Sequence, residues 1–181
     1  MKFYTKCLVA TAMIALMVVP ALAGYTVVAG KIKSLDAENK TFILTDLAEK
    51  DHTFKIGDAL VVNRAGKEGK SDLKTGDTIN LCYDKGTLSW TAHYILVQEG
   101  NDTKSTLMRG SVKGYDESKK ELTITSDAKE DTTYPSGKTM VRVNMEGVNI
   151  DTVKIGDHAL FLLDVIDGKT TLRSVMIDRA K

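Results

Sequence analysis

The chain has 181 residues, of which 43% are hydrophobic and 27% are charged. This composition is typical of a globular protein and excludes a disordered or collagen-like chain. Its 25 Lys and Arg residues nearly balance 24 Asp and Glu residues, and neither sign forms a long run. We therefore expect no nucleic-acid partner and no anionic membrane surface bound through bulk positive charge.

Residues 1–23 have the pattern of a cleavable signal peptide. Lys2 and Lys6 precede an apolar stretch at 7–19, and the small-x-small sequence Ala21-Leu22-Ala23 follows it. Cleavage after Ala23 leaves 158 residues with 23 basic and 24 acidic side chains. The apolar stretch is shorter than the roughly 20 residues that span a bilayer, and no later segment is long enough. We therefore expect a periplasmic or extracellular protein with no integral membrane segment after signal cleavage.

The sequence has two cysteines, and Cys7 is lost with the signal peptide. Cys82 then has no partner within the chain, so an internal disulfide is excluded. An unpaired thiol in an exported protein is either buried and inert or used between chains. Of these two, we favour a buried and inert Cys82.

The mature sequence contains an internal repeat. Placing Gly30 on Gly110 aligns two stretches, 30–97 and 110–177, without a gap. This register predicts two copies of one module, with repeat 1 at 24–100, a polar linker at 101–105 and repeat 2 at 106–181. The fifteen identical pairs are Gly30/Gly110, Lys33/Lys113, Asp36/Asp116, Lys40/Lys120, Thr45/Thr125, Ala48/Ala128, Asp51/Asp131, Thr53/Thr133, Gly57/Gly137, Val61/Val141, Lys74/Lys154, Gly76/Gly156, Asp77/Asp157, Asp84/Asp164 and Thr91/Thr171.

Short runs in each copy alternate apolar and polar residues with a period of two, and no segment has a sustained helical period. Five or six short strands close most economically into a small barrel, because closure makes a core and removes sheet edges. We therefore predict an all-β protein of two tandem small β-barrels, related by the internal repeat, with OB-like or SH3-like topology. The strands expected in copy one, and at the matching positions of copy two, are 26–35, 41–46, 52–56, 60–65, 78–84 and 87–98.

Two turn-forming motifs occur once in each copy. A strand and turn of the form G-x-[IV]-K-x-[LY]-D stands at 30–36 and 110–116, and a turn of the form [LV]-K-x-G-D stands at 73–77 and 153–157. The second motif predicts a turn that needs glycine, followed by an aspartate that binds backbone N–H groups. Together the two motifs resemble those of small β-barrel modules of unknown function found in exported bacterial proteins. The resemblance implies a barrel and an envelope location, and it carries over no activity or site.

A soft-metal site is one hypothesis for function, because thiol, imidazole and thioether groups bind copper and similar ions. The candidate residues are Cys82, Trp90, His93, Met108, Met140, Met145 and Met176. The expected strand pairing argues against a shared site. A hairpin turn at Lys85-Gly86 would place Cys82 opposite Ser89 and His93 opposite Thr78, roughly 13 Å apart along the strand.

Trp90 has the opposite parity to His93 and would pair with Leu81 as a core aromatic residue. We therefore predict a mostly buried Trp90, with Leu81 and Tyr83 on the same side of the sheet, and no metal site or cofactor. Copper or another soft metal stays open as an alternative.

Catalysis has no sequence support. His52, His93 and His158 fall at unmatched positions of the two copies, and no G-x-S-x-G or H-E-x-x-H motif accompanies them. Cys82 has no histidine partner nearby in the sequence. We therefore predict no catalytic residues and no enzyme activity.

One difference between the copies predicts a contact. The segment 159–163 is apolar on both faces, whereas its counterpart in copy one, 78–83, is polar on one face. A strand that is buried on both sides implies a cover on the outside of its barrel, formed by the other copy or by another chain. We expect Leu160 and Leu162 to pack against the other barrel.

The function that fits these features is an exported, non-enzymatic binding or assembly module of the bacterial envelope. Its partner would be another envelope protein or a second copy of the chain. A copper or other soft-metal binding protein and an oligosaccharide-binding module are the alternatives.

Overall fold

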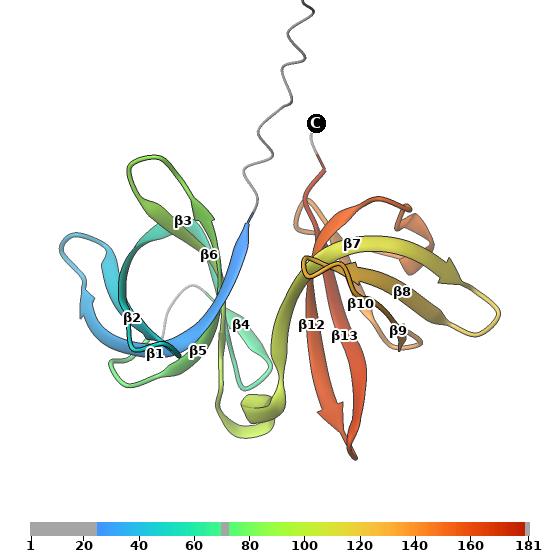
Figure 1. The fold of residues 1–181 in the computed structure, drawn as a ribbon, viewed down its shortest axis with the longest axis horizontal. Helices are drawn as coiled ribbons and strands as arrows, with labels where there is room; N and C mark the ends of the chain where they lie inside the picture. The colour runs from blue at the N-terminus through green and yellow to red at the C-terminus, as the bar shows by residue number, and fades with distance from the viewer. Residues whose placement is uncertain (1–24, 70–72, 180–181) are drawn as a thin grey trace, which may run out of the picture.

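The computed structural model describes residues 25–69 and 73–179 and shows two small β-barrels side by side (Figure 1). Apart from two short 3-10 segments, all regular structure in the described residues is β-strand, as predicted. The expected signal peptide and its cleavage site lie outside the described residues. Within the described part of the chain, no helix is both long and apolar enough to cross a bilayer.

The first barrel is a closed one of five strands with a short sixth strand at its edge. Its sheet order is β2-β1-β5-β6-β3-β4, and an additional pairing of β2 with β3 closes the barrel. β3 and β6 run parallel, whereas the other pairs are antiparallel. The strands are β1 (Thr26–Asp36), β2 (Thr41–Asp46), β3 (Asp51–Arg64), β4 (Lys67–Gly69), β5 (Thr78–Lys85) and β6 (Trp90–Val97).

The second barrel repeats the arrangement with one strand divided. Its sheet order is β11-β10-β13-β12-β7-β8-β9, with β10 and β13 parallel. β7 and β8 begin and end at the positions that the repeat register matches to the ends of β1 and β2. The strands are β7 (Thr106–Asp116), β8 (Glu121–Ser126), β9 (Asp131–Pro135), β10 (Met140–Val143), β11 (Glu146–Val148), β12 (His158–Ile166) and β13 (Lys169–Ile177).

The prediction of separate strands at 52–56 and 60–65 was wrong for the first copy. β3 runs without a break from Asp51 to Arg64, and the segment around Gly57-Asp58 is an irregularity in its pairing with β6 and not a turn. The strand follows the barrel around this corner, so its first half pairs with β2 and its second half with β4.

Proline explains why the second copy divides this strand. The backbone N–H of Ile56 donates to Lys40, next to β2, so the N–H of Lys55 points to the opposite neighbour, β6. Pro135 occupies the position of Lys55 in copy two and has no N–H to donate. β9 accordingly ends at Pro135, and β10 begins at Met140.

The [LV]-K-x-G-D turn has the predicted geometry in both copies. Gly76 and Gly156 have φ angles of 94° and 90°, which glycine adopts without steric cost. The following carboxylates accept from the backbone, Asp77 from Lys74 N–H at 2.7 Å and Asp157 from Lys154 N–H at 2.7 Å. The motif therefore shapes the turn before β5 and before β12.

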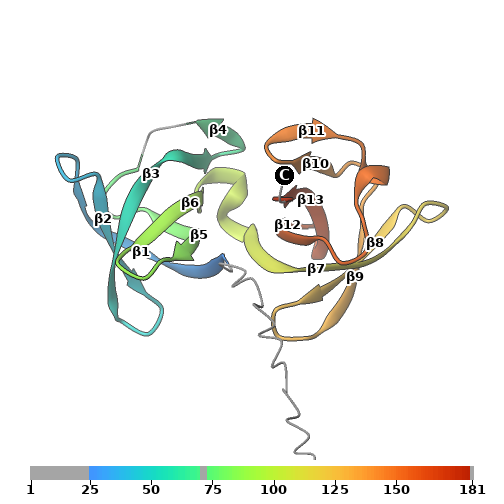
Figure 2. The ribbon, with the colours of Figure 1, turned by 90° about the horizontal axis from the view of Figure 1, so that it is seen from above.

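Each barrel has its own core, and the linker between them is ordered. The first core is centred on Phe42, Phe54 and Leu81, and the second on Phe161 and the strands around it. The linker, expected only as a polar connection at 101–105, forms the 3-10 segment η1 (Gly100–Lys104) between the barrels (Figure 2).

Candidate ligand-binding cleft between the barrels

A third apolar cluster joins the outer faces of the two barrels. Leu160 and Leu162 of β12 are 8% and 1% exposed, and they pack with Cys82, Tyr94 and Leu96 of the first barrel. The prediction that these leucines pack against the other barrel is confirmed. The apolar face that suggested a partner chain is thus covered by this chain itself.

A β-bulge in the β5–β6 hairpin decides which side chains reach this interface. Tyr83 lies opposite Ala92 and Cys82 lies opposite Tyr94, so His93 is the extra residue of the bulge. Ala92 and Ile95 on either side belong to the core. His93 and Tyr94 consequently both face outward, toward the second barrel.

The expected register of this hairpin was therefore wrong. Trp90 pairs with Lys85, because the loop spans 86–89 and is longer than the expected turn at Lys85-Gly86. Cys82 lies opposite Tyr94 and not opposite Ser89, so it is next to His93 across the hairpin and not four residues of strand away from it. The two side chains line the same cleft.

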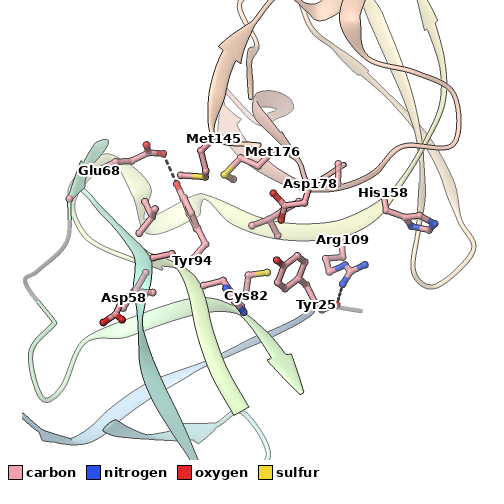
Figure 3. Close-up of a pocket in the computed structure, with 17 residues that line it drawn as sticks. Tyr25, Asp58, Glu68, Cys82, Tyr94, Arg109, Met145, His158, Met176 and Asp178 are labelled. Atoms are coloured by element: carbon pink, nitrogen blue, oxygen red, sulfur yellow. Dashed lines mark hydrogen bonds between the residues drawn. The ribbon is translucent and has the colours of Figure 1, made fainter. Parts of the chain in front are cut away.

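This inter-barrel cleft has a volume of about 1000 Å³ and takes its walls from both barrels (Figure 3). Leu60, Val61 and Leu160 make its lining largely apolar, together with the thioethers of Met145 and Met176. It is large enough for a small organic molecule, and a mostly apolar pocket between domains is a common place for one to bind.

Tyr25 crosses from the first barrel into this cleft. Its ring meets the His93 ring edge-on, with centroids 4.8 Å apart, and lies 5.8 Å from the Arg109 guanidinium. Arg109 also donates to the backbone carbonyl of Tyr25, and the Asp178 carboxylate of the second barrel lies near the Tyr25 ring (Figure 3). Burial, and then the nearby Asp178 carboxylate, raise the pKa of Tyr25 to about 12.

At the other end of the cleft, a hydrogen-bonded chain connects the two barrels. Tyr94 donates its hydroxyl to Glu68 at 3.0 Å and accepts from the Asn63 side-chain amide at 2.9 Å. Glu68 in turn forms an ion pair with Arg142 of the second barrel. Burial raises the pKa of Tyr94, so this hydroxyl stays protonated as the chain requires.

Cys82 lies in the floor of the cleft and is only 2% exposed. Burial raises the pKa of its thiol to about 12, so the thiol is protonated at neutral pH. The expectation of a buried cysteine is confirmed. A protonated thiol is a poor nucleophile, which agrees with the expected inertness.

The structure brings together only some of the metal candidates. Cys82, His93, Met145 and Met176 line the cleft, whereas Trp90 does not. No three His, Cys, Asp or Glu side chains among residues 25–69 and 73–179 are grouped closely enough to hold a metal ion. Burial lowers the pKa of His93, which leaves its imidazole neutral near pH 7.

Trp90 lies instead at one end of the first barrel. It stacks on His52 and on Tyr83, with ring centroids 5.2 Å apart in each pair, and it packs against the core. The side chain is half-buried, with the Lys85 ammonium 4.9 Å from its ring. Tyr83 and Leu81 share its side of the sheet as predicted, but Leu81 pairs with Ile95 and not with Trp90.

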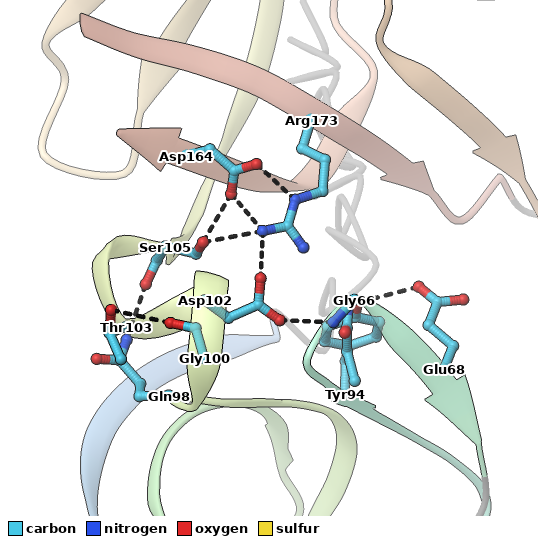
Figure 4. Close-up of polar contacts among 11 residues, drawn as sticks. Gly66, Glu68, Tyr94, Gln98, Gly100, Asp102, Thr103, Ser105, Asp164 and Arg173 are labelled. Atoms are coloured by element: carbon cyan, nitrogen blue, oxygen red, sulfur yellow. Dashed lines mark hydrogen bonds and ion pairs between the residues drawn. The ribbon is translucent and has the colours of Figure 1, made fainter. Parts of the chain in front are cut away.

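A polar network fixes the linker to both barrels (Figure 4). Asp102 is 1% exposed, accepts from the Gly66 N–H of the first barrel at 2.8 Å and pairs with Arg173 of the second at 2.5 Å. Arg173 also binds Asp164 at 2.5 Å, and Ser105 donates to Asp164 at 2.7 Å. Burial alone would raise the pKa of Asp164, but these contacts together hold it below its usual value.

The sequence reasoning missed this network and most of the cleft. Arg173 is the repeat counterpart of His93 and is likewise the extra residue of a bulge, between Leu162/Ser174 and Leu163/Leu172. The repeat register matches position 173 to position 93, so it could have suggested that the two residues occupy equivalent places. Tyr25 and Asp178 lie outside the aligned stretches and gave no signal.

No protein-family model matches the chain, and no curated protein matches it. The resemblance to barrel modules of exported bacterial proteins therefore stays a prediction. Among solved structures, the chain is similar to silver-bound CusF, with 20% identity over 41% of this chain and 97% of that one, and a TM-score of 0.34. It is also similar to a Cu(II) form of an Escherichia coli CusF variant, with 18% identity over 45% of this chain and 99% of that one, and a TM-score of 0.33.

Proposed function

We propose that the protein is an exported, non-enzymatic binding protein that holds a small, largely apolar ligand in the inter-barrel cleft. The observation that carries this proposal is the cleft itself, a volume of about 1000 Å³ between two packed barrels with a mainly apolar lining. Burial of apolar ligand surface supplies the affinity in such a site, and a few polar groups orient the ligand.

The state of the polar groups supports binding and not catalysis. The Cys82 thiol is protonated and buried, and the Tyr94 hydroxyl is hydrogen-bonded to Asn63 and Glu68. Nucleophilic catalysis needs a nucleophile hydrogen-bonded to a base. His93 instead packs its ring against Tyr25.

The aromatic residues favour the cleft over the oligosaccharide alternative. A sugar-binding face presents exposed aromatic rings on which sugar rings stack. Within the described residues, no Phe, Tyr or Trp side chain is exposed, and Trp90 is half-buried against its neighbours.

Binding of a neutral apolar fluorophore such as Nile red tests the proposal. We expect enhanced, saturable emission with one site per chain, and loss of that signal in Val61→Trp, because the indole fills the cleft. Val165→Trp is the matched control, since Val165 is 41% exposed on the distal β12–β13 hairpin. Absence of saturable binding, or equal binding by both variants, would contradict the proposal.

A soft-metal binding protein is the second candidate, and one observation favours it. The bulge at His93 brings imidazole to the same cleft as the Cys82 thiol and the Met145 and Met176 thioethers. Native mass spectrometry with added Cu(I) or Ag(I) decides between the candidates. One tightly held ion that is lost in Cys82→Ser and Met176→Leu would favour the metal, whereas an unchanged mass would favour the organic ligand.

A further inference from the structure

The carboxylates that line the inter-barrel cleft differ in their partners. Glu68 is paired with Arg142, and Asp58 lies 98% exposed at the rim, 3.5 Å from Lys40, whereas Asp178 has no ion pair with a described residue; the guanidinium in the lining is that of Arg109. That guanidinium is already used, since it donates to the Tyr25 carbonyl and lies 3.8 Å from Asp127. A ligand that complements this lining must therefore donate hydrogen bonds and carry positive charge.

Asp178 is the carboxylate that is placed to meet such a ligand. It projects into the cleft opposite Cys82 and beside Tyr25 (Figure 3). The Asp178 side chain is exposed, and no cation among the described residues forms an ion pair with it. Burial has the largest effect on the pKa of Cys82 and raises it, Arg109 lowers it, and Asp178 raises it by a smaller amount, so the charges of both side chains reach the cleft floor.

We propose that the ligand of the cleft is an amphipathic organic cation, with its apolar body between the barrels and its protonated amine against Asp178 and Tyr25. The carboxylate supplies the counter-charge, and the Tyr25 ring offers the aromatic face that organic cations prefer. This inference rests on the proposed function, because it names the chemical class of ligand for the same site.

Three probes with one apolar body and different head groups test the charge preference. Decylammonium, decanol and decyl sulfate, each below its aggregation concentration, compete with Nile red for the full mature chain. We expect decylammonium to bind about threefold more tightly than decanol, because Asp178 is exposed and an exposed ion pair adds only modest affinity, and decyl sulfate to bind most weakly.

Asp178→Asn tests the position of the head group. The amide keeps the size of the side chain but removes its charge, so decylammonium and decanol should bind with about equal affinity, while the affinity for decanol is unchanged. Asp58→Asn is the matched control, because its side chain is 98% exposed at the rim. Tyr25→Phe, which keeps the ring, gives a second variant if Asp178→Asn fails to fold, and it should weaken decylammonium more than decanol.

The outcomes separate the two proposals. If none of the three probes displaces Nile red and Nile red itself does not saturate, the proposed binding function is wrong. If all three bind with equal affinity, or Asp58→Asn acts as strongly as Asp178→Asn, the cleft binds ligands but the cationic class is wrong. If decyl sulfate binds most tightly of the three, the cationic class is likewise wrong.

Discussion

Close backbone approach explains one pair of identical residues in the two copies. A Cβ atom on Gly30 would lie 2.3 Å from the Thr45 carbonyl oxygen, and one on Gly110 would lie 2.3 Å from that of Thr125. Real Cβ atoms do not come this close to backbone oxygen, so β1 can cross β2, and β7 can cross β8, only at glycine. This contact is what lets a strand of 11 residues pair with two neighbours in so small a barrel.

Gly30→Ala should therefore destabilise the first barrel by about 1–3 kcal/mol, because the backbone must move apart to admit the methyl group. Gly114→Ala is the matched control, since nothing lies within 4 Å of its added Cβ and it sits in the corresponding β-strand of copy two. Urea denaturation followed by circular dichroism measures both variants. Equal midpoints for the two would show that the close approach is relaxed in solution.

At the scale of the strand, bulges made the difference between what could and could not be predicted. The alternation of apolar residues was enough to place β2 and β8 at 41–46 and 121–126. It was not enough for the β5–β6 hairpin, because a bulge adds one residue and reverses the parity beyond it. The sequence around His93 carries no mark of that extra residue.

The cleft was beyond sequence reasoning for a different reason. It depends on contacts between residues far apart in the chain, such as Arg109 with the Tyr25 carbonyl and Glu68 with Arg142. Periodicity describes which face of a strand is apolar, and so it did predict that Leu160 and Leu162 need a cover. It does not describe the gap that two covered faces leave between them.

Paired carboxylates at the strand ends predict the acid stability. Burial opposes the charged forms of Asp157 and Asp164, yet their contacts with Arg179 and Arg173 hold the pKa of each carboxyl below its usual value. A carboxyl whose pKa is lower in the folded state stabilises the fold above its unfolded-state pKa, and this contribution is lost as pH falls toward the folded-state pKa. Stability should thus be flat from about pH 7 to 5 and fall below about pH 4.

Thermal melts of the wild type and of Asp164→Asn between pH 3 and 7 measure this. The variant should be less stable at pH 7, and its melting temperature should change less between pH 5 and 3, since one of the titrating groups is gone. Asp151→Asn, at an exposed position in η2 (Ile150–Thr152), is the control and should keep the wild-type profile. A parallel acid profile for Asp164→Asn and the wild type would contradict the assigned role.

At the scale of the whole molecule, two kinds of contact hold the barrels in one orientation. The apolar cluster around Leu162 supplies the buried surface, and the buried Asp102 carboxylate bonds to Gly66 on one side and to Arg173 on the other. Apolar burial has no preferred direction, so by itself it would let the two outer faces slide past each other. The ion pair by itself would add little stability if it were not surrounded by buried groups. Because the cleft lies beside both contacts, its shape depends on them.

Leu162→Asp tests the contribution of the apolar contact. The substitution places a charge in the inter-barrel cluster, where the wild-type side chain is 1% exposed. Burying a leucine is worth roughly 1.5–3 kcal/mol, and an unpaired buried carboxylate costs more. We expect a larger radius of gyration in small-angle scattering, a lower melting temperature and an unchanged monomer mass. Val165→Asp, on the exposed end of the same strand, should change none of the three. If Leu162→Asp instead dissolves an oligomer while each barrel keeps its stability, this face belongs to a second chain in solution and the internal docking is wrong.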